Sequence, residues 1–406
     1  MHLPVHSKSS VNVSVLHGPR DLRLEVRPIE DPGVGELQIA IKSTGICGSD
    51  VSYYNKFANG DLCACAPLSL GHESSGVVVA MGSHVSDFRI GDRVALERMR
   101  FRSSAKSVPH FQGTLQERIN HPAAWCYKLP EHVSFDAAAL LEPLSVAIHA
   151  VNRACPTPGS SALVMGAGTV GLLTAAMARR SGCTNVTICD LDVGRVDYAL
   201  SKGFATHGYV IQRPLHTSSS SSSFSTDASG ASTPLEVGAM TPASLFSDSI
   251  HGKLEGAKGL AAELLTLTNT VFGLQDEDEN EGVDYSFECT GKEVCMHTSI
   301  YATRPGGKVI MVGMGTPIQT LPLSAAHLRE VDILGIFRYA NTYPTGIRLL
   351  CGQQNGSGYG GYQFPKLDDM VTHRFKGLAA AKKAFELASR TMDDNGNLVL
   401  KVVIEA

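Results

Sequence analysis

A glycine-rich turn between a strand and a helix constrains the fold of this chain more than any other feature. The turn spans Gly166–Gly171 in a G-x-G-x-x-G pattern, after the apolar run Ala162–Met165 and before a helical pattern over Gly171–Ser181. The first glycine permits a tight turn, the second lets a pyrophosphate approach the backbone, and the third lets helix and strand pack closely. The helix N-terminus adds amide donors and partial positive charge. We therefore predict a dinucleotide-binding unit here rather than a purely structural turn.

An acidic residue follows this turn at the spacing that a dinucleotide site needs. Asp190 comes directly after the next predicted strand, Asn185–Cys189, nineteen residues after Gly171. A carboxylate in this position accepts hydrogen bonds from the ribose hydroxyls of NAD and repels the 2′-phosphate of NADP. Arg195 could pair with a phosphate, which tempers the preference, but with Asp190 present we expect NAD.

The patterns on either side of this turn indicate two kinds of structure. From Ser161 onward, strand and helix patterns alternate and continue through the apolar runs Asp284–Glu288 and Lys308–Val312, which favours a parallel sheet covered by helices on both faces. Earlier, short β-rich runs alternate with turns and predict a compact barrel-like unit. These runs are Val11–Val15, Glu36–Ser43, Gly76–Ala80 and Arg93–Leu96.

The character of the chain changes near Glu142. Pro143 suits the first position of a helix that continues to Arg153. After Tyr339 we expect the chain to return to the first unit and to end with a helix over Gly377–Ser389 and a strand over Leu398–Ile404. The predicted domains are therefore residues 1–152, completed by 341–406, and residues 153–340.

Two segments do not fit a packed core. An insert at about 214–250 contains six consecutive serines, Ser218–Ser223, and is expected to be a disordered surface loop. Gln275–Glu281 is an acidic run that predicts a solvated loop. Neither segment informs the chemistry.

Composition indicates a soluble cytoplasmic protein. The chain has 406 residues, 43% of them apolar and 18% charged, with a net charge of −4 and no basic block, so nucleic acid and anionic membranes are poor candidate partners. We find no signal peptide and no apolar run long enough to span a bilayer. The ten cysteines are scattered, unlike a secreted disulfide framework, and suit a reducing cytosol.

Three side chains that bind zinc well stand near the start of the chain. Cys47 lies in the run Gly45–Asp50, and His72 and Glu73 follow twenty-five residues later. A lone cysteine is usually a small buried apolar residue, but a site with three protein ligands leaves one position open, as in catalytic zinc sites. Glu142, at a predicted helix start, completes a plausible set. Cys63 and Cys65, spaced C-x-C, are interpreted as free thiols. An open zinc beside a nicotinamide cofactor favours reversible oxidation of an alcohol.

At these residues the chain resembles the zinc-dependent medium-chain dehydrogenase/reductases, and within them the polyol dehydrogenases of the sorbitol, xylitol and L-arabinitol type. The resemblance covers nearly the whole chain apart from the Ser-rich insert. Alcohol dehydrogenases place a cysteine ligand where this chain and the polyol dehydrogenases have Glu142. The matching motifs are Gly45–Asp50, Leu70–Glu73, Gly91–Val94, Cys126–Pro130, Leu141–Val146, Glu288–Gly291, Arg329–Ile333, Gly335–Tyr339 and Val371–Phe375.

The resemblance implies an α/β protein with a GroES-like β-barrel catalytic domain plus a Rossmann doubly wound parallel sheet. It also implies oxidation of a polyol to the ketose with hydride transfer to NAD, one catalytic zinc per chain, and a homo-oligomer. Cys47, His72 and Glu73 resemble the zinc ligands, with Glu142 contacting the zinc-bound water or entering the coordination shell. Ser49 is expected to begin a proton relay. The implied polyol contacts are Tyr53, Glu142, Arg338 and Tyr339, and the implied cofactor contacts are Gly166, Gly168, Val170, Gly171, Asp190, Arg195, Val312, Gly313, Met314 and Phe337.

Two departures from the family pattern leave alternatives open. Relatives usually carry a lobe after the Arg93–Glu97 strand, often with four cysteines that hold a structural zinc. Here Glu97 runs into Arg98–Arg102 and no cysteine occurs between Cys65 and Cys126, so we expect neither that zinc nor the lobe. Many relatives also have a histidine where Ser52 stands. One alternative is a zinc-free quinone or enone reductase on the same fold, and another is an inactive NAD-binding protein. The sequence does not choose among polyols.

Overall fold

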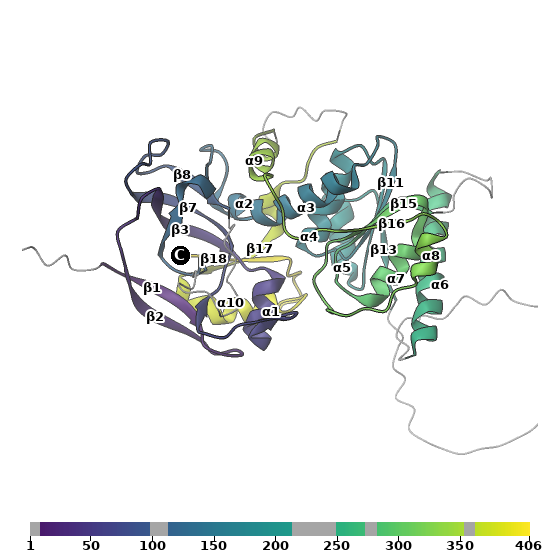
Figure 1. Cartoon of the computed structure of the whole chain (residues 1–406), viewed down its shortest axis with the longest axis horizontal. Coiled ribbons are helices and arrows are strands. Elements are labelled where there is room, and N and C mark those ends of the chain that lie inside the picture. Colours follow the sequence, from purple (N-terminus) through teal and green to yellow (C-terminus); the bar gives the residue numbers. More distant parts are fainter. Residues whose placement is uncertain (1–8, 98–112, 213–248, 273–281, 353–361) are drawn as a thin grey trace, which may run out of the picture.

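The chain forms two lobes that lie side by side (Figure 1). A computed structural model describes residues 9–97, 113–212, 249–272, 282–352 and 362–406. One lobe is built mainly of β-strands from the two ends of the chain. The other alternates strands and helices from its middle.

The β-rich lobe contains a three-stranded sheet in the order β2-β1-β6 and a larger sheet in the order β10-β8-β7-β3-β18-β17, with β9 also paired to β3. Apolar side chains alternate along these strands, and Leu37, Ile39 and Val78 form part of the buried core. The predicted barrel-like unit is confirmed. The strands are β1 (Ser9–Leu16), β2 (Leu22–Ile29), β3 (Glu36–Gly45), β4 (Ala58–Asn59), β5 (Leu62–Cys63), β6 (Leu68–Ser69), β7 (Glu73–Met81), β8 (Arg93–Leu96), β9 (Arg118–Pro122), β10 (Cys126–Lys128), β17 (Val371–Lys376) and β18 (Lys401–Glu405).

The end of the chain supplies two strands of this larger sheet. β18 runs antiparallel to β3, with Val403 opposite Gly45, and parallel to β17. Helices α1 (Gly48–Lys56) and α10 (Ala381–Ala388) pack together beside it, and Tyr54 contacts Phe385 with ring centroids 5.1 Å apart. The first residues of β18 therefore lie beside the loop that follows β3.

The second lobe holds a six-stranded sheet in the order β13-β12-β11-β14-β15-β16, in which every neighbouring pair is parallel. The order reverses between β11 and β14, so the predicted doubly wound parallel sheet is confirmed. Its strands are β11 (Ser161–Met165), β12 (Asn185–Asp190), β13 (His207–Val210), β14 (Val283–Glu288), β15 (Thr303–Met311) and β16 (Asp332–Gly335). The remaining helices are α2 (Phe135–Ala139), α3 (Leu141–Ala154), α4 (Thr169–Arg180), α5 (Val193–Ser201), α6 (Ile250–Phe272), α7 (Glu293–Ala302), α8 (Leu323–His327) and α9 (Tyr343–Gly352).

Several predicted boundaries were wrong by a few residues. Helix α4 begins at Thr169 rather than Gly171, so Gly171 lies inside the helix. A Cβ atom at Gly171 would lie 1.8 Å from the Gly166 carbonyl oxygen, which explains the third glycine of the turn. Helix α3 begins at Leu141 rather than Pro143, because α2 continues into it through Leu140. Proline is tolerated in this first turn because its missing N–H has no partner within the helix.

The C-terminal elements also begin later than predicted. Helix α10 starts at Ala381, after a 3₁₀ turn over Leu378–Ala380, and β18 starts at Lys401 rather than Leu398. Strand β15 ends at Met311, so residues 312–314 belong to the loop after it.

The serine-rich insert, the acidic run and residues 98–102 lie wholly or mostly outside the described residues.

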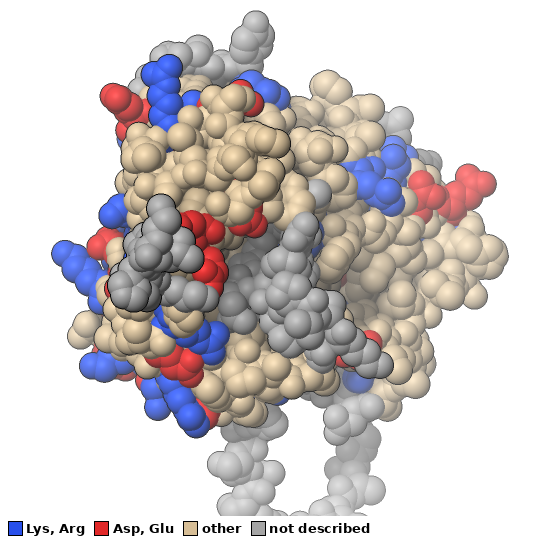
Figure 2. All heavy atoms as spheres, turned by 60° about the vertical axis from the view of Figure 1, so that its left-hand side comes forward, with Lys and Arg blue, Asp and Glu red and all other residues tan. Residues whose placement is uncertain are grey.

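Within the described helices, none combines the length and apolar character that crossing a membrane requires. On the face shown in Figure 2, the described acidic and basic side chains are interspersed.

Candidate functional site

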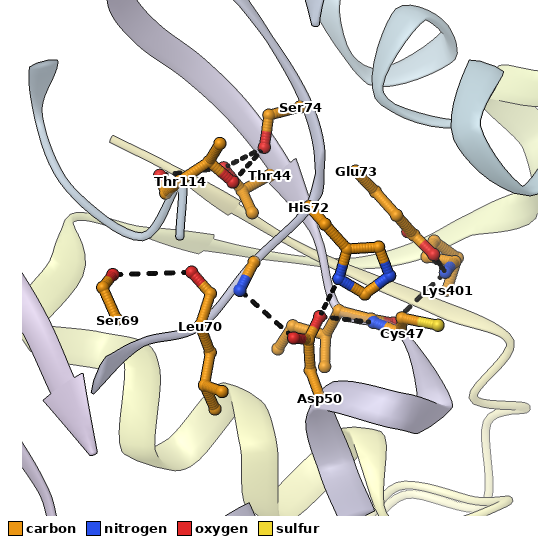
Figure 3. A network of polar contacts seen from close by, with 12 residues as sticks. Thr44, Cys47, Asp50, Ser69, Leu70, His72, Glu73, Ser74, Thr114 and Lys401 are labelled. Atoms are coloured by element: carbon orange, nitrogen blue, oxygen red, sulfur yellow. Dashed lines mark hydrogen bonds and ion pairs between the residues drawn. The ribbon is translucent and has the colours of Figure 1, made fainter. Parts of the chain in front are cut away.

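Cys47, His72 and Glu73 converge on one point of the β-rich lobe, as Figure 3 shows. Their potential ligand atoms all lie within 4.8 Å of one another. Cys47 precedes helix α1, and Glu73 is the first residue of β7, which pairs with β3 so that Glu73 stands opposite Gly45. His72 and Glu73 are buried, and Cys47 is partly exposed. The pairing of two neighbouring strands thus brings together residues that are twenty-five positions apart.

Gly45 makes room for the Glu73 carboxylate. A Cβ atom at Gly45 would lie 2.3 Å from Glu73 Oε2, well inside van der Waals contact. Gly45, two residues before Cys47, is therefore a packing requirement of the third ligand.

Asp50 holds the two ligand loops together. Its Oδ2 lies 3.2 Å from His72 Nδ1, and its carboxylate accepts backbone hydrogen bonds from Gly71 at 3.2 Å and Cys47 at 3.4 Å. A carboxylate on Nδ1 orients the ring and leaves Nε2 for a metal, as in many zinc sites. Burial alone would lower the pKa of His72, but Asp50 and Cys47 raise it well above its usual value. Sequence reasoning gave Asp50 no role, although its position three residues after Cys47 is a capping-box spacing.

Lys401 is a second residue that sequence reasoning missed. Its ammonium lies 2.7 and 3.0 Å from the two Glu73 carboxylate oxygens and 3.2 Å from the Ile46 carbonyl oxygen. The two side chains are 3% and 1% exposed. Burial alone would lower the pKa of Lys401, but the charges of Glu73 and Cys47 raise it, so the lysine is cationic. The sequence feature that could have identified it is a single lysine within the otherwise apolar run Leu398–Ile404.

Glu142 lies close to this group but outside the three-residue cluster. It is buried in the first turn of α3. Burial raises the pKa of Glu142, and the charge of Glu73 adds to this, whereas His72, Arg338 and Lys401 oppose it. This carboxyl group is therefore within electrostatic range of both the ligands and Arg338.

The residues predicted to contact a polyol fall into two places. Burial and then the charge of Glu142 raise the pKa of Tyr339, whose ring packs against Tyr343 with centroids 5.6 Å apart. Arg338 and Tyr339 therefore lie on the Glu142 side of the site. Tyr53 is buried in α1, in the apolar cluster that includes Ile46. Ser49, in the first turn of the same helix, is about nine-tenths buried.

A cavity of about 320 Å³ lies at the carboxyl ends of β11 and β12. Gly166 and Asp190 line it, as expected for the crevice at the switch point of a doubly wound sheet. Asp190 also accepts hydrogen bonds from the backbone of Ala167 at 2.7 Å and Asp192 at 3.0 Å, so it fixes the glycine-rich turn. Further lining residues that sequence reasoning missed include Leu191, Ile211, Thr290 and Lys292. The sequence feature that could have identified these residues is their position just after predicted strands or in the adjoining loops.

The other predicted cofactor residues do not line this cavity. Gly168 and Val170 lie at the start of α4, with Gly171 one turn inside it. Arg195 lies near Gly168 and directs Nη2 at the Val399 carbonyl oxygen, 3.5 Å away in the other lobe. Val312 and Gly313 follow β15, and Met314 and Phe337 are 58% and 65% exposed.

The residues at the converging site fit a zinc ion. A thiolate, an imidazole and a carboxylate are the usual ligands of this metal, and three of them leave a coordination position open. The buried Asp50–His72 pair supplies the outer carboxylate that commonly accompanies a zinc-bound histidine. The geometry can therefore hold one metal ion beside Glu142.

Comparison with known proteins agrees with this geometry. Residues 33–131 match the alcohol dehydrogenase GroES-like domain, and residues 245–351 match the zinc-binding dehydrogenase family. Sorbitol dehydrogenase from Homo sapiens is 35% identical over 92% of this chain and 91% of its own length, and that from Gallus gallus is 36% identical over 93% and 92%.

Solved structures show the same fold. L-idonate 5-dehydrogenase from Escherichia coli superposes with a TM-score of 0.71 at 21% identity, covering 98% of this chain and 99% of the other. The 2R,3R-butanediol dehydrogenase from Bacillus subtilis superposes with a TM-score of 0.70 at 22% identity, covering 98% and 100%. The chain therefore belongs to the zinc-dependent medium-chain dehydrogenases, in the family of the sorbitol dehydrogenases.

Proposed function

We propose that this protein is a zinc-dependent dehydrogenase that oxidises a polyol of the sorbitol, xylitol or L-arabinitol type to the ketose and transfers hydride to NAD. The observation that carries the proposal is the convergence of partly exposed Cys47 with buried His72 and Glu73 beside Glu142, in a chain that is 35% identical to sorbitol dehydrogenase over 92% of its length. When bound, zinc supplies the Lewis acidity that promotes ionisation of the alcohol.

Each residue of the metal side has a proposed role. Cys47, His72 and Glu73 hold the zinc, and Asp50 fixes the orientation of His72. Glu142, buried close to them, accepts a hydrogen bond from the reacting hydroxyl or its water, or enters the coordination shell. Ser49, adjacent to the Cys47 loop, passes the proton towards solvent.

The remaining hydroxyl groups of the polyol need donors and acceptors further from the metal. Arg338 and Tyr339, on the Glu142 side, are proposed to bind them, with Tyr53 at the α1 side of the site. Bringing these groups into one fixed arrangement orients the carbon that loses hydride.

NAD is proposed to lie across the carboxyl edge of the six-stranded sheet. Its adenosine end fits the cavity beside Gly166 and Asp190, and its pyrophosphate fits the N-terminus of α4 at Gly168, Val170 and Gly171. The nicotinamide end then points towards the metal side. Arg195, Val312, Gly313, Met314 and Phe337 are the further proposed contacts.

The proposed domain division places residues 1–152 and 341–406 in the catalytic domain and residues 153–340 in the NAD-binding domain. The sheets support it, because β17 and β18 pair within the same sheet as β3, whereas β11 to β16 form a separate sheet.

The inactive NAD-binding alternative is not favoured. All three zinc-site side chains are present and converge, and Asp50 and Lys401 pair with them in the interior. The same residues argue against a zinc-free reductase, which lacks this set.

We further propose a cytoplasmic homo-oligomer. All ten cysteines are free thiols, as suits a reducing compartment. Strand β16 lies at the edge of its sheet, and the chain segment that precedes it exposes apolar side chains, with Ile318 at 86% and Leu328 at 76%. A second copy covering this edge would protect both the open strand and the apolar surface.

An assay of NADH formation over a panel of polyols tests the proposed function. We expect turnover of at least one of sorbitol, xylitol and L-arabinitol, loss of turnover with a strong chelator, and recovery with Zn²⁺. Folded protein that binds no zinc and oxidises none of the panel after reconstitution contradicts the proposal.

A further inference from the structure

We infer that Lys401 is a positioning residue that shares Glu73 with the metal and thereby sets how easily the metal is released. The inference rests on the proposed function, because it assumes that zinc binds at Cys47, His72 and Glu73.

The contacts of Lys401 satisfy its whole ammonium group. An ammonium has three donors, and its three partners here are Glu73 Oε1, Glu73 Oε2 and the Ile46 carbonyl oxygen. Figure 3 shows the contact between Lys401 and Glu73. Both side chains are almost completely buried, so water does not compete for these contacts. A carboxylate has about four acceptor positions, which leaves Glu73 able to bind a metal while it remains paired with Lys401.

The backbone that carries Lys401 is held from both lobes. The Leu400 amide donates to Thr372 Oγ1 at 3.1 Å within the β-rich lobe. From the glycine-rich turn, Thr169 Oγ1 contacts the Leu400 carbonyl oxygen, and Arg195 contacts the carbonyl oxygen of Val399, both at 3.5 Å. The ammonium therefore has a fixed place beside Glu73, as a positioning role requires.

The charges determine the direction of the effect. Without metal, a buried carboxylate lacking a partner is strongly destabilising, so Lys401 stabilises the empty site through Glu73. With metal, the same cation withdraws negative charge from one ligand and repels Zn²⁺. Both effects make zinc binding less favourable. Removal of the Lys401 charge should therefore tighten zinc binding and destabilise the metal-free protein.

The test compares Lys401→Met with Lys401→Arg in the full-length protein. Zinc release from the loaded protein is followed with an excess of a chromophoric chelator, and the absorption of the Co²⁺-substituted protein reports the ligand field. We expect Lys401→Met to release zinc on the order of tenfold more slowly, because the cation that repels Zn²⁺ is gone, and to change the cobalt spectrum. Lys401→Arg keeps the charge and should restore both properties.

Lys308→Met is the matched control. Lys308 is a partly buried lysine in the other lobe whose ammonium donates to the Ala154 carbonyl oxygen at 3.0 Å, and its removal should leave zinc release unchanged. Lys401→Gln provides a second neutral variant if Lys401→Met does not fold, and should also slow the release.

The outcomes separate this inference from the proposed function. Equal or faster zinc release from folded neutral variants than from wild type overturns the role of Lys401. Wild-type protein that holds no zinc at all overturns the proposed function instead.

Discussion

The two lobes prepare their ligand sites in different ways. The metal side uses buried charged side chains from separate parts of the chain, with Glu73 and Lys401 separated by 328 positions. The cofactor side uses the glycine-rich turn and Asp190, which lie in one continuous stretch from β11 to β12, together with walls from later segments of the same lobe. The first site should therefore be sensitive to the loss of a single charge, and the second to the gain of a single methyl group.

Removal of a zinc ligand should have the largest effect. Cys47→Ala and His72→Ala are expected to lose tightly held zinc and to reduce polyol-dependent NADH formation by at least about a thousandfold, since several kcal/mol of charge stabilisation disappears. NADH binding, measured by fluorescence, should change little because it depends on the other lobe. Cys63→Ala removes an exposed thiol and is the control, with zinc content and turnover as in wild type. Wild-type rates of NADH formation in Cys47→Ala and His72→Ala would show that these residues do not hold a catalytic metal.

A single methyl group should damage the cofactor side. Gly171→Ala places a Cβ atom 1.8 Å from the Gly166 carbonyl oxygen, so the glycine-rich turn must shift. We expect a loss of stability of about 1–3 kcal/mol from overpacking and an increase in the Kd for NADH on the order of tenfold or more. Zinc content should remain one ion per chain.

Gly18→Ala is the control for this substitution, because a Cβ atom at Gly18 meets nothing within 4 Å. It should leave the thermal midpoint and NADH affinity unchanged. An equally small effect of Gly171→Ala would mean that the close approach does not constrain this turn.

The glycine-rich turn could be predicted from one continuous stretch of sequence, whereas the surroundings of the metal side could not, for a physical reason. The glycine spacing and Asp190 lie within one strand–helix–strand unit, and such a unit can be predicted from the local pattern of apolar residues. The zinc ligands were found as isolated motifs, but their convergence depends on the pairing of β3 with β7. Lys401 could not be assigned, because its contact with Glu73 arises from a strand at the other end of the chain.

The boundaries that were wrong reflect tertiary context in the same way. Pro143 is a good first helical residue in isolation, yet α2 runs directly into α3 and moves the start to Leu141. The roles of the individual site residues remain predictions, because they depend on contacts with zinc, NAD and polyol that sequence patterns do not specify.

Replacement of the partner of a zinc ligand should have an intermediate effect on the metal side. Asp50→Asn keeps the shape of the side chain but removes the charge that orients His72 through Nδ1. We expect zinc affinity, measured by competition with a chelator, to fall by roughly 10–100-fold. Gly71 donates to Oδ1 and Cys47 to Oδ2, so the single amide oxygen of asparagine keeps one of these two hydrogen bonds. Circular dichroism checks that the variant is folded. Unchanged zinc affinity would show that the ring is held by packing alone.

The smallest effect is expected from a carboxylate that joins strands of the second lobe. Asp284 accepts from the backbone amide and hydroxyl of Ser161 and pairs with Arg304. Burial raises the pKa of Asp284, but these partners outweigh it and hold the pKa below its usual value of 3.8. The stabilisation is therefore present above about pH 3.8 and is lost as the pH falls through the lower pKa of the folded protein.

Asp284→Asn tests this sign. Denaturant unfolding at neutral pH should show a loss of about 1 kcal/mol in the variant. The difference from wild type should shrink as the pH falls below about 4, where the unfolded carboxylate is protonated. A difference that stays constant with pH would show that shape, rather than charge, makes the contact.

The most direct test of the account is the number of zinc ions per chain measured together with the rate of NADH formation from sorbitol, xylitol and L-arabinitol during stepwise removal of zinc. We predict that the rate with the best polyol falls in proportion to the zinc lost, reaches the background when none remains, and returns when one Zn²⁺ per chain is restored. A rate that persists after all the zinc has been removed would contradict the assignment of Cys47, His72 and Glu73 as a catalytic metal site.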